Sequence, residues 1–422
     1  MKKVTKRAIA LVLTLILMMS AVSISAFAAS ETTVKQYKTY VSLGDSIAGG
    51  FSMPHYLTYK KLIVSKKSIC GSYPDLVAEQ VNAEKFYPLA QPGFRTNEIR
   101  LMLDPTYNGD EISEKYLGRL SGAKYTLENL TVQRPEYIKK VKEADLITLD
   151  IGFNDTWIPI AALSLKMQDN LNAARSDESI VADYIEQLGG MGAFLEYTYN
   201  AIYNILSVPE YAIKFQQALY KIFIEVNTNY TAIVNKIYEL NPDVTVVSLD
   251  CYNPFRDWDV PKGSGVKTLA MLTQPLYNTI NANKRTAGAV HGDKYICVNN
   301  DNVELITKEM PPLDQFGDLL GGGFNPHPTV AGHKDIADHI IAALPEGKRS
   351  SSATIKHMYK INGSWGVYDG NLNRITTYTG IASTAASKWY VSKGRFVSSK
   401  NGKVNYGGHT YTIKNGKVTA VK

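Results

Sequence analysis

Five short apolar runs, spaced along most of the chain, constrain its fold more than any other feature. Each run is bounded by turn-forming residues and is largely apolar throughout, as expected of a strand buried on both faces of a parallel sheet. The predicted strands are Tyr37 to Leu43, Lys85 to Leu89, Leu146 to Ile151, Val244 to Leu249 and Lys294 to Val298.

Segments with the apolar spacing of helices separate these runs. The predicted helices are Tyr73 to Asn82, Thr96 to Leu103, Pro135 to Glu143, Asn227 to Leu240, Thr268 to Thr286 and Thr329 to Leu344. Strands that alternate with helices form a parallel sheet covered on both faces. The predicted fold class is therefore α/β, a three-layer α/β/α sandwich.

Two segments are longer than simple connections require. Residues Pro105 to Arg134 are rich in Gly, Tyr and charged residues and are predicted to have mixed structure. Residues 156–226 contain aromatic helical stretches and are predicted to form a helical cap beside a functional site. We expect most of these aromatic side chains to be core, with the lining of an acyl pocket as the alternative.

The amino terminus is typical of a secretory signal peptide. Lys2, Lys3, Lys6 and Arg7 precede an apolar run that ends at Met19, and Ala26-Phe27-Ala28 has the form of a cleavage site. Residues 1–28 are predicted to be removed on export, so the protein is predicted to be secreted, without a stable membrane span after cleavage. An uncleaved membrane anchor is the alternative.

The charge balance excludes some classes of partner. The signal segment carries four of the 46 basic residues and none of the 39 acidic residues, so the remainder has a formal charge of +3. Such a weak charge does not suggest a nucleic-acid partner. The three cysteines, Cys70, Cys251 and Cys297, form no ligand pattern and allow at most one intrachain disulfide. We expect buried free thiols.

Composition changes after Pro345, where Gly, Ser, Thr, Lys and Tyr become dominant. Residues 346–353 are predicted to be a linker, and residues 354–422 a tail of β-hairpin repeats. The three predicted copies lie at 363–370, 388–394 and 411–418. The tail resembles the aromatic and glycine repeats of secreted bacterial proteins, including cell-wall-binding repeats. This resemblance implies a possible cell-wall polymer as a partner, and a structural appendage without a ligand is the alternative.

Four blocks that could carry chemistry follow one another along the chain. Gly44-Asp45-Ser46 places a serine where a strand meets a helix, a position at which a hydroxyl can be exposed above the edge of a sheet. By itself Ser46 could be a helix cap. The other blocks run from Ala90 to Thr96 and include Gly93, from Asp150 to Asp155 and include Asn154, and from Asn325 to His333 and include His327.

This order resembles that of the SGNH hydrolases, also called the GDSL lipase and esterase family, over about Tyr40 to Leu344. The resemblance implies a flavodoxin-like fold for residues 34–345, with Ser46 as nucleophile and His327 as its base. It also implies an oxyanion hole formed by the backbone N–H groups of Ser46 and Gly93 and the side-chain amide of Asn154. Asp155 is predicted to bridge its own turn. His333 is predicted to be a structural or surface histidine.

The chain departs from the family pattern at two positions. Phe324 stands where the family commonly has an Asp that orients the histidine, so the third member of the triad is open between a backbone carbonyl near Phe324 or Asn325 and the carboxylate of Asp314 or Asp318. Ile47 replaces the usual Leu, a swap of similar volume.

The resemblance implies a secreted serine esterase that needs no cofactor and no metal. Its expected substrate is a small ester, namely a lipid or lysophospholipid ester. One alternative is a carbohydrate esterase that removes acetyl groups from an acylated glycan. The other is a non-catalytic cell-wall-binding protein that keeps an esterase fold.

Overall fold

The computed structural model describes residues 37–51, 53–56, 67–110, 113, 126–169, 180–188, 191–256, 268–306, 327–345 and 354–422. The predicted signal peptide and linker lie outside these ranges. Within them, no helix combines the length and the apolar character that a membrane crossing requires. All three cysteines are described, and all three are free thiols.

A five-stranded parallel sheet forms the centre of the molecule, as predicted. Its strands are β1 (Thr39–Gly44), β2 (Lys85–Pro88), β3 (Leu146–Asp150), β4 (Thr245–Leu249) and β5 (Tyr295–Val298). They lie in the order β2-β1-β3-β4-β5, with every neighbouring pair parallel. This is the flavodoxin-like order, in which the strand order reverses between β1 and β3 and ligands bind beyond the carboxyl ends of the strands.

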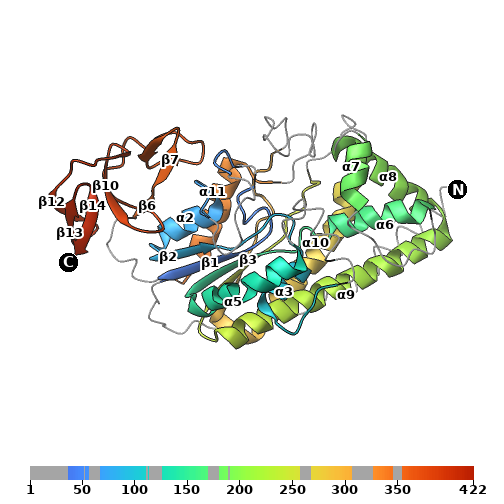
Figure 1. Cartoon of the computed structure of the whole chain (residues 1–422). Helices are drawn as coiled ribbons and strands as arrows, with labels where there is room; N and C mark the ends of the chain where they lie inside the picture. The colour runs from blue at the N-terminus through green and yellow to red at the C-terminus, as the bar shows by residue number, and fades with distance from the viewer. Residues whose placement is uncertain are drawn as a thin grey trace.

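Helices cover both faces of the sheet, which confirms the three-layer prediction (Figure 1). On one face, α3 (Thr96–Leu103), α5 (Leu127–Glu143) and α9 (Pro209–Leu240) bury their apolar sides in one core cluster. On the other face, α2 (Tyr73–Gln80) and α11 (Val330–Ala343) form a second cluster. The helix α10 (Thr268–Ala287) packs against α9, and the 3-10 helix η3 (Ala289–Lys294) leads into β5.

Two helices begin well before their predicted first residues, whereas the other boundaries differ by one or two residues. Helix α5 begins at Leu127 rather than at Pro135, because the Thr126 side chain accepts a hydrogen bond from the backbone N–H of Asn129 and caps the helix. Pro135 therefore lies inside α5. Helix α9 runs without a break through Val226 and Asn227, where two separate helical segments were predicted, because both of its halves bury an apolar side.

Residues 156–226, called here the helical insertion, contain α6 (Trp157–Asp169), α7 (Val181–Gln187), α8 (Met191–Ser207) and the first half of α9. Their apolar side chains form a cluster of their own, which includes Leu163 and Phe215. The prediction that the aromatic residues are mostly core holds for Phe194 but is wrong for Tyr203 and Tyr220, which are exposed.

The C-terminal region forms one antiparallel sheet of nine strands, called here the C-terminal sheet. Its strands are β6 (Lys356–His357), β7 (Tyr359–Ile361), β8 (Ser364–Gly366), β9 (Gly380–Ser383), β10 (Lys388–Ser392), β11 (Arg395–Phe396), β12 (Gly402–Tyr406), β13 (His409–Lys414) and β14 (Lys417–Val421).

Three hairpins in this sheet turn through the same two-residue pattern, a residue followed by glycine, with both φ angles positive. The turns are Asn362-Gly363, Lys393-Gly394 and Asn415-Gly416. Positive φ at both positions is the mark of the tight hairpin turn that suits the twist of antiparallel strands. Each of these hairpins is a strand, a glycine turn and a strand. Two of them cover the predicted copies at 388–394 and 411–418, whereas the first spans 359–366 and so begins before the predicted copy at 363–370.

A cluster of charged groups joins the C-terminal sheet to α2. Asp75 pairs with Nδ1 of His357 at 2.5 Å, and Glu79 pairs with Nζ of Lys356 at 3.0 Å. The hydroxyl of Tyr359 also donates to Asp75. Asp75, Glu79 and His357 are grouped as metal ligands could be, but an ammonium group and hydroxyl and backbone donors already occupy the carboxylate oxygens. The arrangement is that of a buried ion-pair cluster.

Candidate active site

Ser46 lies in a tight turn directly beyond the carboxyl end of β1. The backbone N–H of Asp45 donates to the carbonyl oxygen of Asp150 at 3.1 Å, which holds this turn against the end of β3. Gly44 has φ of 152°, and a Cβ at this position would lie 2.2 Å from the same carbonyl oxygen. Only glycine lets the two strand ends approach so closely.

Gly93 lies in the loop beyond the carboxyl end of β2. The N–H of Gln91 donates to the carbonyl oxygen of Gly44 at 2.9 Å, so this loop is bonded to the turn that carries Ser46. The N–H of Phe94 closes a turn onto Gln91 at 3.1 Å. Gly93 itself has φ of 80°, a left-handed conformation that glycine adopts without strain.

Asn154 follows the carboxyl end of β3 and is buried. Its side-chain Nδ2 donates to the carbonyl oxygen of Phe94 at 3.0 Å. The residues beyond β2, β1 and β3, three neighbouring strands, are thus joined by hydrogen bonds. An amide nitrogen carries two hydrogens, so this bond leaves the second N–H of Asn154 for another acceptor.

His327 lies just before α11 and packs against the turn that carries Ser46. Its ring contacts Phe51, with 4.6 Å between the ring centroids, and the N–H of Phe51 donates to the carbonyl oxygen of Ser46 at 3.0 Å. The carbonyl oxygen of His327 accepts from the N–H of Ile306 at 2.9 Å, which anchors the histidine beyond β5.

Burial keeps His327 neutral. The low-dielectric surroundings, and secondarily the charge of His333, lower the pKa of His327 to about 3. A neutral imidazole is the form that can accept a proton. His333 is fully buried, and its Nδ1 accepts from the N–H of Tyr73 at 3.3 Å, so it joins α11 to the start of α2. His333 thus occupies a structural position.

Asp155 does not bridge its own turn, contrary to the prediction. Its carboxylate accepts the backbone N–H and the side-chain hydroxyl of Thr96, the first residue of α3. Burial raises the pKa of Asp155 to about 7, although the hydrogen bonds from Thr96 oppose this shift. The consecutive residues Asn154 and Asp155 therefore hold both Phe94 and the start of α3.

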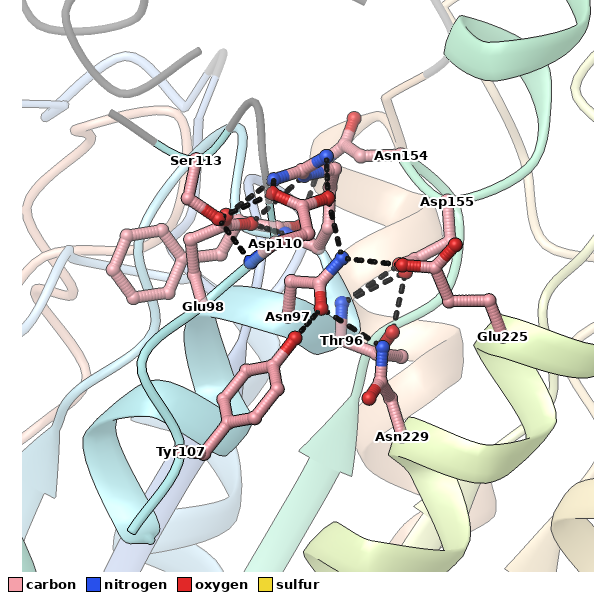
Figure 2. Close-up of polar contacts among 12 residues, drawn as sticks. Thr96, Asn97, Glu98, Tyr107, Asp110, Ser113, Asn154, Asp155, Glu225 and Asn229 are labelled. Atoms are coloured by element: carbon pink, nitrogen blue, oxygen red, sulfur yellow. Dashed lines mark hydrogen bonds and ion pairs between the residues drawn. The ribbon is translucent and has the colours of Figure 1, made fainter. Parts of the chain in front are cut away.

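A buried polar network fixes the other side of the Gly93 loop. Arg95 makes ion pairs with Glu98 at 2.6 Å and with Asp110 at 3.1 Å, and all three side chains are nearly inaccessible to solvent. Figure 2 shows Asn97 at the centre of further contacts, which extend to Asp110 on one side and to α9 on the other. Sequence reasoning missed this network, and only the opposite charges of Arg95 and Glu98, three residues apart at the start of α3, hinted at it.

A second group of buried charges lies beneath the Ser46 turn. Oδ1 of Asp45 accepts the N–H of Ile47 at 3.0 Å, and burial together with Asp150 raises the pKa of Asp45 well above its usual range. Burial also raises the pKa of Asp150 to about 6, which the charge of Lys284 opposes. Nζ of Lys284 donates to the carbonyl oxygen of Leu249 at 2.8 Å. This ammonium group balances carboxyl charge at the ends of β1 and β3.

The group that would orient His327 falls outside the described residues. Phe324, Asn325, Asp314 and Asp318 all lie between 307 and 326. The choice between a backbone carbonyl and an acidic side chain stays a prediction.

No protein-family model matches the chain, and a search of curated proteins finds no match. Similar solved structures include phospholipase A1 from Streptomyces albidoflavus NA297, with 16% identity and a TM-score of 0.40 over 73% of this chain and 99% of that one. An extracellular lipase from Streptomyces rimosus has 18% identity and a TM-score of 0.41 over 72% and 99% of the two chains.

A family 2 carbohydrate esterase with a carbohydrate-binding domain, from Corynascus thermopiles, has 12% identity and a TM-score of 0.34 over 75% and 68% of the two chains. At such low identities and TM-scores, these likenesses assign neither a family nor an activity to the chain.

Proposed function

We propose that this chain is a serine esterase, with Ser46 as nucleophile and His327 as general base. One observation carries the proposal. The Ser46 turn, the Gly93 loop and the Asn154 amide are bonded to one another beyond the carboxyl ends of three adjacent strands, and a neutral histidine packs against the same turn. This is the edge at which sheets with this strand order bind ligands.

The reaction follows from the chemistry of these groups. As Oγ of Ser46 bonds to the ester carbonyl carbon, the neutral imidazole of His327 takes the hydroxyl proton. The imidazolium then gives that proton to the leaving alkoxide, and an acyl-enzyme forms. Water attacks the acyl group, passes a proton to His327 and releases the acid, and the proton returns to Oγ of Ser46.

Negative charge develops on the carbonyl oxygen in both steps. The proposed donors are the N–H groups of Ser46 and Gly93 and the second N–H of Asn154. Because the Asn154 amide is already bonded to Phe94, its orientation is fixed before substrate binds. A donor that needs no reorganisation contributes most to stabilising the transition state.

The surroundings of Asn154 favour an apolar acyl group. Phe153 belongs to a buried cluster with Tyr277 and Ile280, and the helical insertion begins two residues after Asn154. We therefore propose carboxylic esters of lipid or lysophospholipid type as substrates. Deacetylation of a glycan, and a binding role without catalysis, become the alternative outcomes of the test.

The test compares three forms of the exported chain: the wild type, Ser46→Ala and Ser42→Ala. Ser42 is buried in β1, so its replacement removes a hydroxyl four residues before the proposed nucleophile. We expect a fluorophosphonate probe to label the wild type and Ser42→Ala but not Ser46→Ala. Turnover of p-nitrophenyl esters should follow the same pattern and should favour long acyl chains.

Other outcomes separate the alternatives. Turnover limited to acetyl esters and acetylated xylan would support a carbohydrate esterase. Equal labelling of all three forms would show that the probe reacts elsewhere. An unlabelled and inactive wild type would leave the binding role.

A further inference from the structure

Charge is distributed very unevenly along this chain. Residues 354–422 contain eleven Lys and Arg residues but a single acidic residue, Asp369, which gives this region a formal charge of +10. Residues 29–353 contain 31 basic and 38 acidic residues, a formal charge of −7. The small overall charge of the exported chain hides this separation. Figure 1 shows the C-terminal sheet at the end of the molecule opposite the helical insertion.

Three exposed lysines of the C-terminal sheet lie on one face of β12, β13 and β14. Side chains alternate between faces along a strand, and the register places Lys403 opposite Thr412, and Lys414 opposite Lys417. Lys403, Thr412, Lys414 and Lys417 thus share a face, called here the lysine face. The other face of these strands carries Val404, Tyr411, Ile413 and Val418, which are packed in a core cluster.

The lysine face carries an unfavourable pair. Lys414 and Lys417 lie directly opposite each other across the Asn415-Gly416 turn, and like charges at such positions destabilise a sheet. Within the described residues, neither lysine forms an ion pair with a carboxylate. Lys417 lies over the ring of Trp389 on β10, with 5.7 Å from Nζ to the ring centroid, so its ammonium group is held at the sheet surface. An anion between the two lysines would relieve their repulsion.

The side chains indicate which anion. Arginine pairs bidentately with either carboxylate or phosphate and so fixes the geometry of its ligand, whereas lysine binds phosphate as a point charge and suits a flexible chain of phosphates. Nine of the eleven basic residues are lysine. Asn405, Thr410 and Thr412 lie among the lysines and can bond to hydroxyl groups of a ligand. Proteins that bind single-stranded nucleic acid stack successive bases on aromatic rings. Tyr406 and Tyr411 belong to the cluster on the opposite face, and the ring of Trp389, which pairs with Lys417 across the sheet, lies beneath the Lys417 ammonium group.

We propose that the lysine face binds a linear polyol-phosphate polymer, in which phosphodiester groups alternate with short hydroxylated units. The phosphates contact Lys403, Lys414 and Lys417, and the threonine and asparagine side chains bond to the intervening hydroxyl groups. This surface holds the enzyme on an anionic polymer while its acidic part, which contains the proposed ester-cleaving site, is repelled from the same polymer.

The test uses the full chain with Ser46→Ala, so that binding is measured apart from any ester cleavage. The protein is titrated into fluorescently labelled poly(glycerol phosphate), and binding is followed by fluorescence anisotropy at about 50, 100 and 200 mM salt. The test variant is Lys403→Gln, Lys414→Gln and Lys417→Gln together. The matched control, Lys139→Gln, Lys142→Gln and Lys221→Gln, removes the same charge from exposed helix positions elsewhere.

We expect the lysine-face variant to lose at least tenfold in affinity and the control to lose less than twofold. The slope of log affinity against log salt should fall in magnitude by about 2 in the lysine-face variant, as counterion release predicts for three phosphate contacts. The lysine-face variant should keep the melting temperature of its control, which shows that lost binding is not lost folding, and the single variant Lys414→Gln should keep or raise it.

Three results would overturn the proposal. The first is equal affinity of the lysine-face variant and its control. The second is equal binding of neutral dextran. The third is competition by single-stranded DNA of equal charge as strong as that by the polyol phosphate, which would identify a nucleic-acid surface instead.

Discussion

The side-chain amide of Asn154 and the carbonyl oxygen of Phe94 are joined by a 3.0 Å hydrogen bond between two loops that are sixty residues apart in sequence. This bond ties one proposed oxyanion donor to the loop that carries another, at Gly93. The two donors therefore cannot move independently, and their spacing is set before substrate arrives.

Replacing Asn154 by Ala removes both the donor and the bond to Phe94. We expect kcat to fall by about 10² to 10³ with little change in KM, because the interaction is made with the transition state. Steady-state kinetics on a p-nitrophenyl ester measure this. An unchanged kcat, with the protein still folded by circular dichroism, would remove Asn154 from the mechanism.

Asp155 is predicted to act as a positioning residue. Asp155→Ala removes the acceptor for the first N–H of α3, which should cost about 1 kcal/mol of stability and lower kcat by about 10-fold to 100-fold through misplacement of the Gly93 loop. Asp155→Asn keeps an oxygen acceptor and should restore most of the kcat. If both variants lower only the melting temperature, Asp155 has a structural role alone.

The pH profile should reveal the buried base. Because the pKa of His327 is lowered to about 3, the imidazole stays neutral far below the usual histidine range. We expect kcat/KM at pH 5 to exceed half of its value at pH 7. The fall of kcat/KM in acid reports the pKa of the base in the free enzyme. A half-maximal point near 6.5 would contradict this. Asp155→Asn is the control for titration of that carboxyl.

The cluster between α2 and β6 should make docking of the C-terminal sheet pH-dependent. Burial alone would lower the pKa of His357, but the charge of Asp75 raises it above 6.5. Burial would raise the pKa of Asp75, but the charge of His357 lowers it below 3.8. The stability that the Asp75 carboxylate contributes to docking is thus lost as pH falls through its lowered pKa. The His357 contribution is complete below pH 6.5 and is lost as pH rises through its raised pKa.

Docking of the C-terminal sheet should therefore be tightest at pH values between the lowered pKa of Asp75 and the raised pKa of His357, and it should loosen in alkaline solution. Glu79 and Lys356 face the same pair and are retained in every variant. We expect His357→Gln to cost about 3 kcal/mol near pH 6, the usual penalty for breaking a buried pair. Hydrogen exchange of α2 and β6 measures this. His409→Gln, at an exposed position, is the control, and equal exchange in both variants would contradict the prediction.

Local patterns in the sequence account for the central sheet and for the chain positions brought to its edge. The five apolar runs became β1 to β5. The central strands β1, β3 and β4 are almost wholly buried, whereas the edge strands β2 and β5 are only partly buried. The blocks at Ser46, Gly93 and Asn154 follow the ends of β1, β2 and β3. Strand ends converge in a parallel sheet whatever the intervening sequence, so short-range signals suffice there.

Contacts between distant residues could not be predicted in this way. Asp155 caps α3 across 59 positions, and His357 meets Asp75 across 282. In neither pair does the local sequence around one residue identify its distant partner. The continuity of α9 was also missed, because Asn227 and Thr228 weaken a helix by propensity, whereas packing on both sides of them maintains it.

Helix α9 is a single rod of 32 residues, about 48 Å long at the usual rise. Phe215 in its first half belongs to the core of the helical insertion, while Ile233 in its second half belongs to the core beneath the sheet. The insertion is therefore not an exchangeable module. An engineer who grafts another insertion onto this scaffold must preserve the phase of α9, since a deletion of one residue rotates every upstream apolar side chain by about 100°.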